Sequence, residues 1–191
     1  MQCNVRRAVI GDEPVLRALR LQALTDSPGA FSSTYERELA RTIEDWRRWL
    51  APGVTFILDA GGEPRGLVAG SREPHDVSVV HLVAMWVHPD LRGTGAADVL
   101  VSSVKAWAGQ VGATQVHLKV VESNCRASCP AQIESQWRWN KAIWIGHISN
   151  RHTVFLHICI DFGSLLRKNA RARIEGRASP SARVLRPRNA L

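Results

Sequence analysis

The stretch Trp86-Val87-His88-Pro89-Asp90-Leu91-Arg92-Gly93-Thr94-Gly95-Ala96-Ala97-Asp98 decides the fold, because it joins a strand to a helix through a turn with two glycines. The apolar, valine-rich run from Val77 to Val87 predicts a strand before the turn. After the turn, apolar residues recur every three or four positions and predict one buried face of a helix: Ala97, Leu100, Val101, Val104, Trp107, Ala108 and Val111.

The turn between them has the features of an anion-binding site. Gly93 and Gly95 allow backbone conformations that are closed to residues with a Cβ, and they let a ligand approach closely. The first amides of the following helix have no partner within the helix, and the helix dipole favours negative charge there. Arg92 adds a planar cation with several donors. A pyrophosphate group fits this combination.

Two common nucleotide-binding motifs do not match this turn. A Walker loop needs Gly-Lys-Ser/Thr at its end, which is absent here. A dinucleotide fingerprint needs a third small residue where the chain has Asp98, and an acid about twenty residues further on. Glu122 comes too late for that role.

The remaining pattern resembles the GNAT superfamily of acyl-CoA N-acyltransferases, whose signature is Arg/Gln-x-x-Gly-x-Gly/Ala after a strand ending in Val-x-Pro. Arg92-Gly93-Thr94-Gly95-Ala96-Ala97 fits that signature. The order of elements is also similar over residues 4 to 127: a strand at 4–10, helices after Asp12 and near Thr42, a hairpin with arms at 54–60 and 65–70, the strand and helix above, and a strand at 114–122. The resemblance implies an α/β (α+β) fold with a mixed, mostly antiparallel central sheet flanked by helices.

The resemblance also implies an activity, the direct transfer of an acetyl group from acetyl-CoA to a primary amine. It places the acyl donor on the backbone at the end of the strand that precedes the glycine turn, and on the turn itself. A later asparagine touches the coenzyme A arm. No metal is expected. The residues at the matching positions are Met85, Trp86, Val87, Arg92, Gly93, Thr94, Gly95, Ala96, Ala97 and Asn124.

Two residues are candidates for the base that removes a proton from the amine. Several family members carry a glutamate six residues before the valine that matches Val87, and this chain has His81 there. Neutral imidazole can take a proton near pH 7, although a strand histidine with a structural hydrogen bond is the alternative interpretation. Glu122 could act instead through a water molecule. By analogy of fold, the segment between the first two helices supplies candidate acceptor contacts: Phe31, Tyr35, Glu36 and Glu38.

The resemblance ends after Asn124, which gives an atypical or incomplete C-terminal part. Family members continue with Leu-Tyr and Gly-Phe, and that tyrosine often protonates the departing thiolate, whereas the only tyrosine here is Tyr35. We expect a GNAT-like core at 1–128, a divergent segment at 129–166 and a disordered basic tail at 167–191, which carries +7 of the net charge of +8. The divergent segment is either a folded ending with a late strand at 153–160 or the product of a reading-frame shift near codon 127.

Two other functions remain open from the sequence. The chain could be a catalytically impaired acyl-CoA-binding protein, since the tyrosine is missing. Alternatively, a zinc and nucleic-acid module could use the basic tail together with the ligands Cys125, Cys129, His147 and His152, although their spacing is loose and a nucleic-acid partner is not expected.

The chain composition bears on location and assembly. The start lacks the apolar region of a signal peptide, no apolar run approaches the length of a membrane span, and four cysteines are too few for a disulfide scaffold. We therefore expect a cytoplasmic protein without a membrane partner. Without the usual last strands a sheet edge would be exposed, so a homodimer is one expected form.

Overall fold

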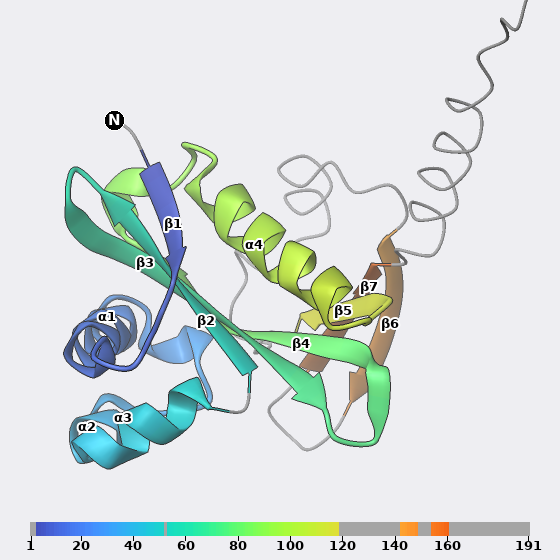
Figure 1. Ribbon diagram of the computed structural model, residues 1–191, viewed down its shortest axis with the longest axis horizontal. Coiled ribbons are helices and arrows are strands. Elements are labelled where there is room, and N and C mark those ends of the chain that lie inside the picture. Colours follow the sequence, from blue (N-terminus) through green and yellow to red (C-terminus); the bar gives the residue numbers. More distant parts are fainter. Residues whose placement is uncertain (1–2, 52, 119–141, 149–153, 161–191) are drawn as a thin grey trace, which may run out of the picture. The chain divides into compact units, whose positions relative to one another are not determined.

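A five-stranded sheet organises the computed structural model, which describes residues 3–51, 53–118, 142–148 and 154–160 (Figure 1). The strand order is β1-β2-β3-β4-β5, with antiparallel pairs from β1 to β4 and a parallel β4–β5 pair. The sheet is therefore mixed and mostly antiparallel, which confirms the fold class expected from the sequence. The strands are β1 (Cys3–Arg7), β2 (Gly53–Ala60), β3 (Glu63–Glu73), β4 (Asp76–Val87) and β5 (Gln115–Leu118).

The first strand is shorter than predicted, because it ends at Arg7 rather than Ile10. The amide of Val9 donates to the carboxylate of Asp12 at 2.8 Å, which turns the chain toward the first helix. Val9 and Ile10 are consequently exposed. The predicted hairpin is present, and Gly61 and Gly62 both take positive φ in its turn.

One face of the sheet is covered by a layer of helices that precede β2 in the sequence. These are α1 (Glu13–Asp26), α2 (Tyr35–Leu39) and α3 (Ile43–Leu50), with a 3-10 turn, η1 (Pro28–Ala30), after α1. Thr42 and Asp45 form a capping box that starts α3 where the sequence predicts it. Their core with the sheet consists of Ala8, Leu16, Leu19, Ala23, Trp46, Ile57, Leu67 and Trp86.

The opposite face is covered by α4 (Ala96–Gln110), the helix that follows the glycine turn. Its buried residues include Leu100, Val101, Val104 and Trp107, which confirms the predicted apolar face. A Cβ added at Gly70 of β3 would lie 3.0 Å from the Trp107 ring, so only glycine lets the helix pack this closely. Gly70 and Leu67 are three residues apart on one strand, so they point to opposite faces of the sheet.

A second sheet consists of β6 (Ala142–Ile148) and β7 (Val154–Ile160), which pair antiparallel. β7 lies within 153–160, where the first of the two alternatives, a folded ending, places a late strand. The candidate residues Glu122, Asn124, Cys125, Cys129 and His152 lie outside the described residues, and the side chain of His147 is not described. Within the described ranges, no helix is long and apolar enough to cross a membrane.

Candidate active site

The end of β4 departs from regular strand geometry. Leu67 pairs with Trp86 and Ala69 pairs with Val83, so β4 has one more residue than β3 between these two pairs. The extra residue makes a β-bulge, and within it Ala84 has a φ of 54°, a conformation that L-residues with a Cβ rarely adopt. Such local strain is typical of functional sites.

The described pairing of β4 with β5 covers only the first part of β4. The described β4–β5 pairs run from Val79 with Gln115 to Leu82 with Leu118. The last five residues of β4, which include Met85, Trp86 and Val87, have no described pairing on that side.

The glycine turn presents several unpaired amides at the start of α4. Gly93 and Gly95 have φ values of 79° and 85°, and Gly95 is the N-cap of the helix. In the described part of the chain, the amides of Gly93, Gly95, Ala96 and Ala97 have no hydrogen-bond acceptor. Thr94 is held within the turn, since its hydroxyl donates to the Leu91 carbonyl at 2.7 Å. The predicted anion-binding geometry is therefore present.

Arg92 uses its side chain to hold the turn in place. Its Nε donates to the Val87 carbonyl at 3.1 Å, and its Nη2 donates to the carboxylate of Asp26 at the end of α1. The same carboxylate accepts from the indole of Trp86 at 3.0 Å and from the hydroxyl of Ser27 at 2.7 Å. In this structure the guanidinium therefore positions the turn, and the unpaired amides are the groups that face a ligand.

Two carboxylates near the turn have shifted pKa values. Burial raises the pKa of Asp26, but hydrogen bonds from Trp86, Ser27 and Arg92 outweigh burial and lower that pKa to about 2. Burial also raises the pKa of Asp98 in the first turn of α4. Asp26 is therefore a permanent anion at neutral pH that fixes Arg92.

His81 is buried on β4 and has one ring nitrogen bonded and one free. Only 7% of the residue is exposed. Its Nε2 lies 2.5 Å from Oε2 of Glu73 at the end of β3, whereas its Nδ1 is buried without a hydrogen-bond partner. The imidazole also makes an edge contact with the ring of His117, with centroids 5.6 Å apart.

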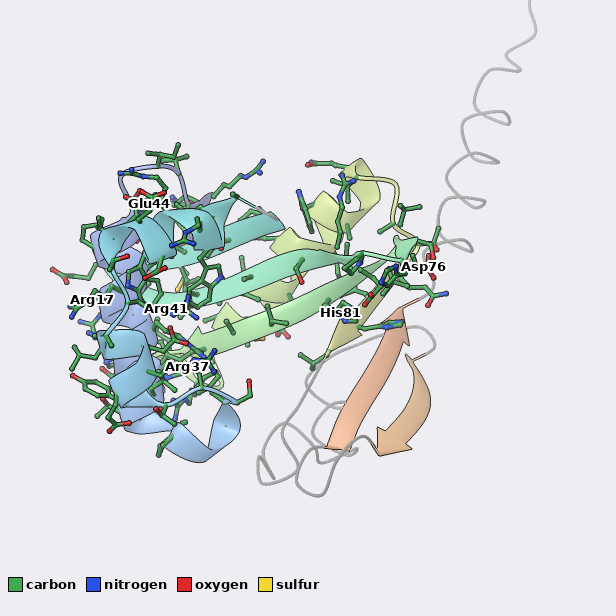
Figure 2. All side chains as sticks on the ribbon, turned by 90° about the horizontal axis from the view of Figure 1, so that it is seen from below. Arg17, Arg37, Arg41, Glu44, Asp76 and His81 are labelled. Carbon is green, nitrogen blue, oxygen red and sulfur yellow. The ribbon has the colours of Figure 1, made fainter. Side chains whose placement is uncertain are left out.

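The face on which His81 lies follows from the strand register. Ala69 and Leu67 share a face of β3, so Ser71 lies on that face as well, and Ser71 pairs with His81. His81 therefore lies on the face that α1 and α3 cover near Trp86. Figure 2 shows it between Asp76, at the start of β4, and the helix layer that carries Arg17 and Arg41.

The predicted acceptor contacts do not form one group. Tyr35 and Glu36 are exposed on α2, at the surface. Phe31 is half-buried, and the guanidinium of Arg20 stacks over its ring at 4.4 Å. Glu38 is buried and pairs with Arg41 at 2.6 Å, so it contributes to the helix layer rather than to an open surface.

Three features of the site escape the sequence analysis. The positive φ of Ala84, the Asp26 carboxylate and the Glu73–His81 pair all depend on which strands and helices meet. Asp26 and Trp86 are sixty residues apart, and no spacing rule connects them. Glu73 and His81 are only eight residues apart, but the sequence analysis predicts no hairpin between them.

Comparison with known proteins agrees with this geometry. The family model described as the acetyltransferase (GNAT) family matches residues 20–128. A curated acetyltransferase of Pectobacterium atrosepticum is 34% identical over 73 residues, which make up 38% of this chain and 50% of that protein. The chain thus spans about half the length of this curated relative.

Solved structures share the fold. A GNAT-family acetyltransferase from Streptococcus pneumoniae matches with a TM-score of 0.62 and 16% identity, covering 82% of this chain and 97% of that one. The aminoglycoside N-acetyltransferase AAC(6')-Iy, in complex with a bisubstrate analogue of coenzyme A, matches with a TM-score of 0.58 and 18% identity, covering 79% and 99%. With the glycine turn, the bulged β4 and a family match over more than half its length, the chain belongs to the GNAT acetyltransferase family.

Proposed function

We propose that this chain transfers an acetyl group from acetyl-CoA to a primary amine. The observation that carries the proposal is the set of amides at Gly93, Gly95, Ala96 and Ala97, which have no acceptor among the described residues and follow directly after a bulged strand. Four N–H donors at a helix N-terminus suit the two charges of a diphosphate. The backbone at the end of β4, beside these amides, suits an extended chain with amide groups, and the pantetheine arm has this form.

Different groups of the chain bind different parts of acetyl-CoA in this proposal. The turn binds the diphosphate of acetyl-CoA through backbone amides, while Arg92 and Asp26 hold the turn. The backbone at Met85 and Trp86 binds the pantetheine arm and polarises the acetyl carbonyl, and Asn124 remains the expected contact further along the arm. The Val87 carbonyl is already bonded to Arg92, so it is the least free of these groups.

His81 supplies the base in this proposal. Its Nδ1 takes a proton from the ammonium group of the acceptor, and the freed lone pair attacks the thioester carbonyl carbon. The carbon–sulfur bond then breaks, and the thiolate takes the second proton that the new amide nitrogen loses. Three residues along a strand span about 10 Å. We therefore place the acceptor amine between His81 and the bulge, with a water molecule carrying the proton to the buried Nδ1.

The missing tyrosine does not prevent this reaction. A thiol has an ordinary pKa of about 8.5, so the sulfur can leave as a thiolate and be protonated afterwards. The proposed mechanism therefore needs one base and an electrophilic carbonyl, with no protein acid.

The acceptor class is best found with an amine screen. We propose to measure release of free coenzyme A thiol from acetyl-CoA in the presence of kanamycin, spermidine or a peptide that begins with alanine. Turnover with any of them above the rate without amine supports the enzyme. Saturable binding of acetyl-CoA without turnover would instead identify an acyl-CoA-binding protein, and the absence of binding would refute both.

A further inference from the structure

The carboxylate of Glu73 occupies a defined place next to His81. Glu73 stands two residues beyond Ser71 on β3, and Ser71 pairs directly with His81. The two side chains are therefore diagonal neighbours on one face of the sheet, which long side chains can bridge. A register shift between Arg72 and Glu73 interrupts the ladder there, and Glu73 pairs with Asp76.

The short contact fixes which ring nitrogen carries the hydrogen. The side chain of Glu73 is 31% exposed, and an ionised carboxylate can only accept hydrogen bonds. At 2.5 Å from this carboxylate, Nε2 of His81 must therefore carry the hydrogen. A neutral imidazole carries only one ring hydrogen, so Nδ1 keeps its lone pair.

The free nitrogen is the one that the fold leaves unused. Nδ1 of His81 is buried and bonds to no other group in the described ranges. A buried polar atom without a partner costs free energy and calls for a functional or solvent explanation. His117 contacts the edge of the imidazole, which keeps the ring orientation fixed.

We infer that Glu73 is a positioning residue that holds His81 in the Nε2–H tautomer, so that Nδ1 is the proton-accepting atom of the transfer reaction. The role of Nδ1 in the reaction rests on the proposed function, whereas the tautomer of His81 rests on the geometry alone. Glu73 touches neither substrate and acts only through His81. When Nδ1 takes a proton, the carboxylate at Nε2 stabilises the imidazolium that forms.

The test measures both the tautomer of His81 and the turnover number of the enzyme. We propose ¹⁵N–¹H correlation spectra of the histidine-labelled full chain, with the His81 signals assigned by their loss in His81→Gln. The wild-type chain is expected to show Nε2–H. The Glu73→Ala variant is expected to lose that tautomer preference. Its kcat is expected to fall at least about tenfold while its KM for acetyl-CoA stays within about twofold of wild type, as for residues that orient a reacting group.

Two further variants separate positioning from folding. Glu73→Gln keeps an acceptor oxygen and is expected to retain the Nε2–H tautomer, with kcat between wild type and Glu73→Ala. Glu63→Gln, at the exposed other end of β3, is the matched control and is expected to behave as wild type. Thermal melts of all variants identify any that fails to fold.

The outcomes are distinguishable. A wild-type His81 with hydrogen on Nδ1, or a Glu73→Ala variant that is folded and retains wild-type kcat, overturns the inference. If the wild-type chain acetylates none of the three amines, the proposed function fails, and the tautomers of wild type and Glu73→Ala still decide whether Glu73 positions His81.

Discussion

At the scale of single residues, Asp26 connects the helix layer to the glycine turn. Its carboxylate accepts from Trp86, Ser27 and Arg92, and together these donors keep it ionised. One oxygen of this short side chain, Oδ2, thus joins the end of α1, the end of β4 and the start of the turn. Loss of this carboxylate would leave a buried indole N–H and a guanidinium without their acceptor.

Asp26→Asn is expected to destabilise the fold at pH 7 but not at pH 2. The pKa of Asp26 falls from 3.8 to about 2 on folding, so its contribution is complete above pH 4 and disappears as the pH falls toward 2. Discounted for partial exposure, this contribution is about 1 to 2 kcal/mol. Denaturant unfolding of both proteins between pH 2 and 7 measures the difference. The exposed Asp90→Asn serves as control, and a pH-independent difference for Asp26→Asn would contradict the account.

At the scale of elements, the strand–turn–helix unit is the part that the sequence predicts best. Val77 to Val87 and the helix with Leu100 and Val104 follow simple periodicities, and both elements form at the predicted places. The glycine turn is equally local, because its geometry depends on residues that are adjacent in sequence. A local pattern suffices where the interactions are themselves local.

The remaining parts of the site depend on tertiary contacts. The bulge at Ala84 appears only in the register between β3 and β4, and the sequence Val83-Ala84-Met85 itself reads as ordinary strand. Likewise, Arg92 can be recognised as a cation near a phosphate site, but its partner Asp26 lies on a distant helix. The end of the first strand was overestimated because an apolar pattern does not reveal that Asp12 captures the Val9 amide.

Gly95→Ala is expected to weaken acetyl-CoA binding at least about tenfold, because φ of 85° strains any residue with a Cβ and moves the unpaired amides. Gly109→Ala is the matched control in α4. Its added Cβ meets no atom within 4 Å, and alanine there should stabilise the helix by about 0.5 to 1 kcal/mol. Titration calorimetry compares the acetyl-CoA affinity of the two variants, and thermal melts compare their stability. Equal affinity of the two variants would remove Gly95 from the donor site.

At the scale of the whole molecule, we propose that β6 and β7 belong to a divergent ending of the domain. The antiparallel pairing of β6 with β7 supports this. The likeness to the Streptococcus pneumoniae acetyltransferase also covers 82% of the chain, a larger share than residues 1–128 make up.

The gene sequence provides a direct check of this ending. We expect that neither alternative reading frame downstream of codon 127 encodes a Leu-Tyr pair followed by Gly-Phe. If one of them does, the present ending is the product of a frame shift, and the missing tyrosine was lost with it. The core at 1–128 and its glycine turn would be unaffected by that result.

The central claim is that the turn at Arg92 to Ala97 binds the diphosphate of an acyl-coenzyme A. The most direct test is calorimetric titration of the full chain with acetyl-CoA and, separately, with acetyl-pantetheine, which lacks the diphosphate. We predict saturable binding of acetyl-CoA with one site per chain, and affinity for acetyl-pantetheine lower by at least about a hundredfold, since several charge-assisted hydrogen bonds are lost. Equal affinities for the two compounds, or no binding of acetyl-CoA, would contradict the account.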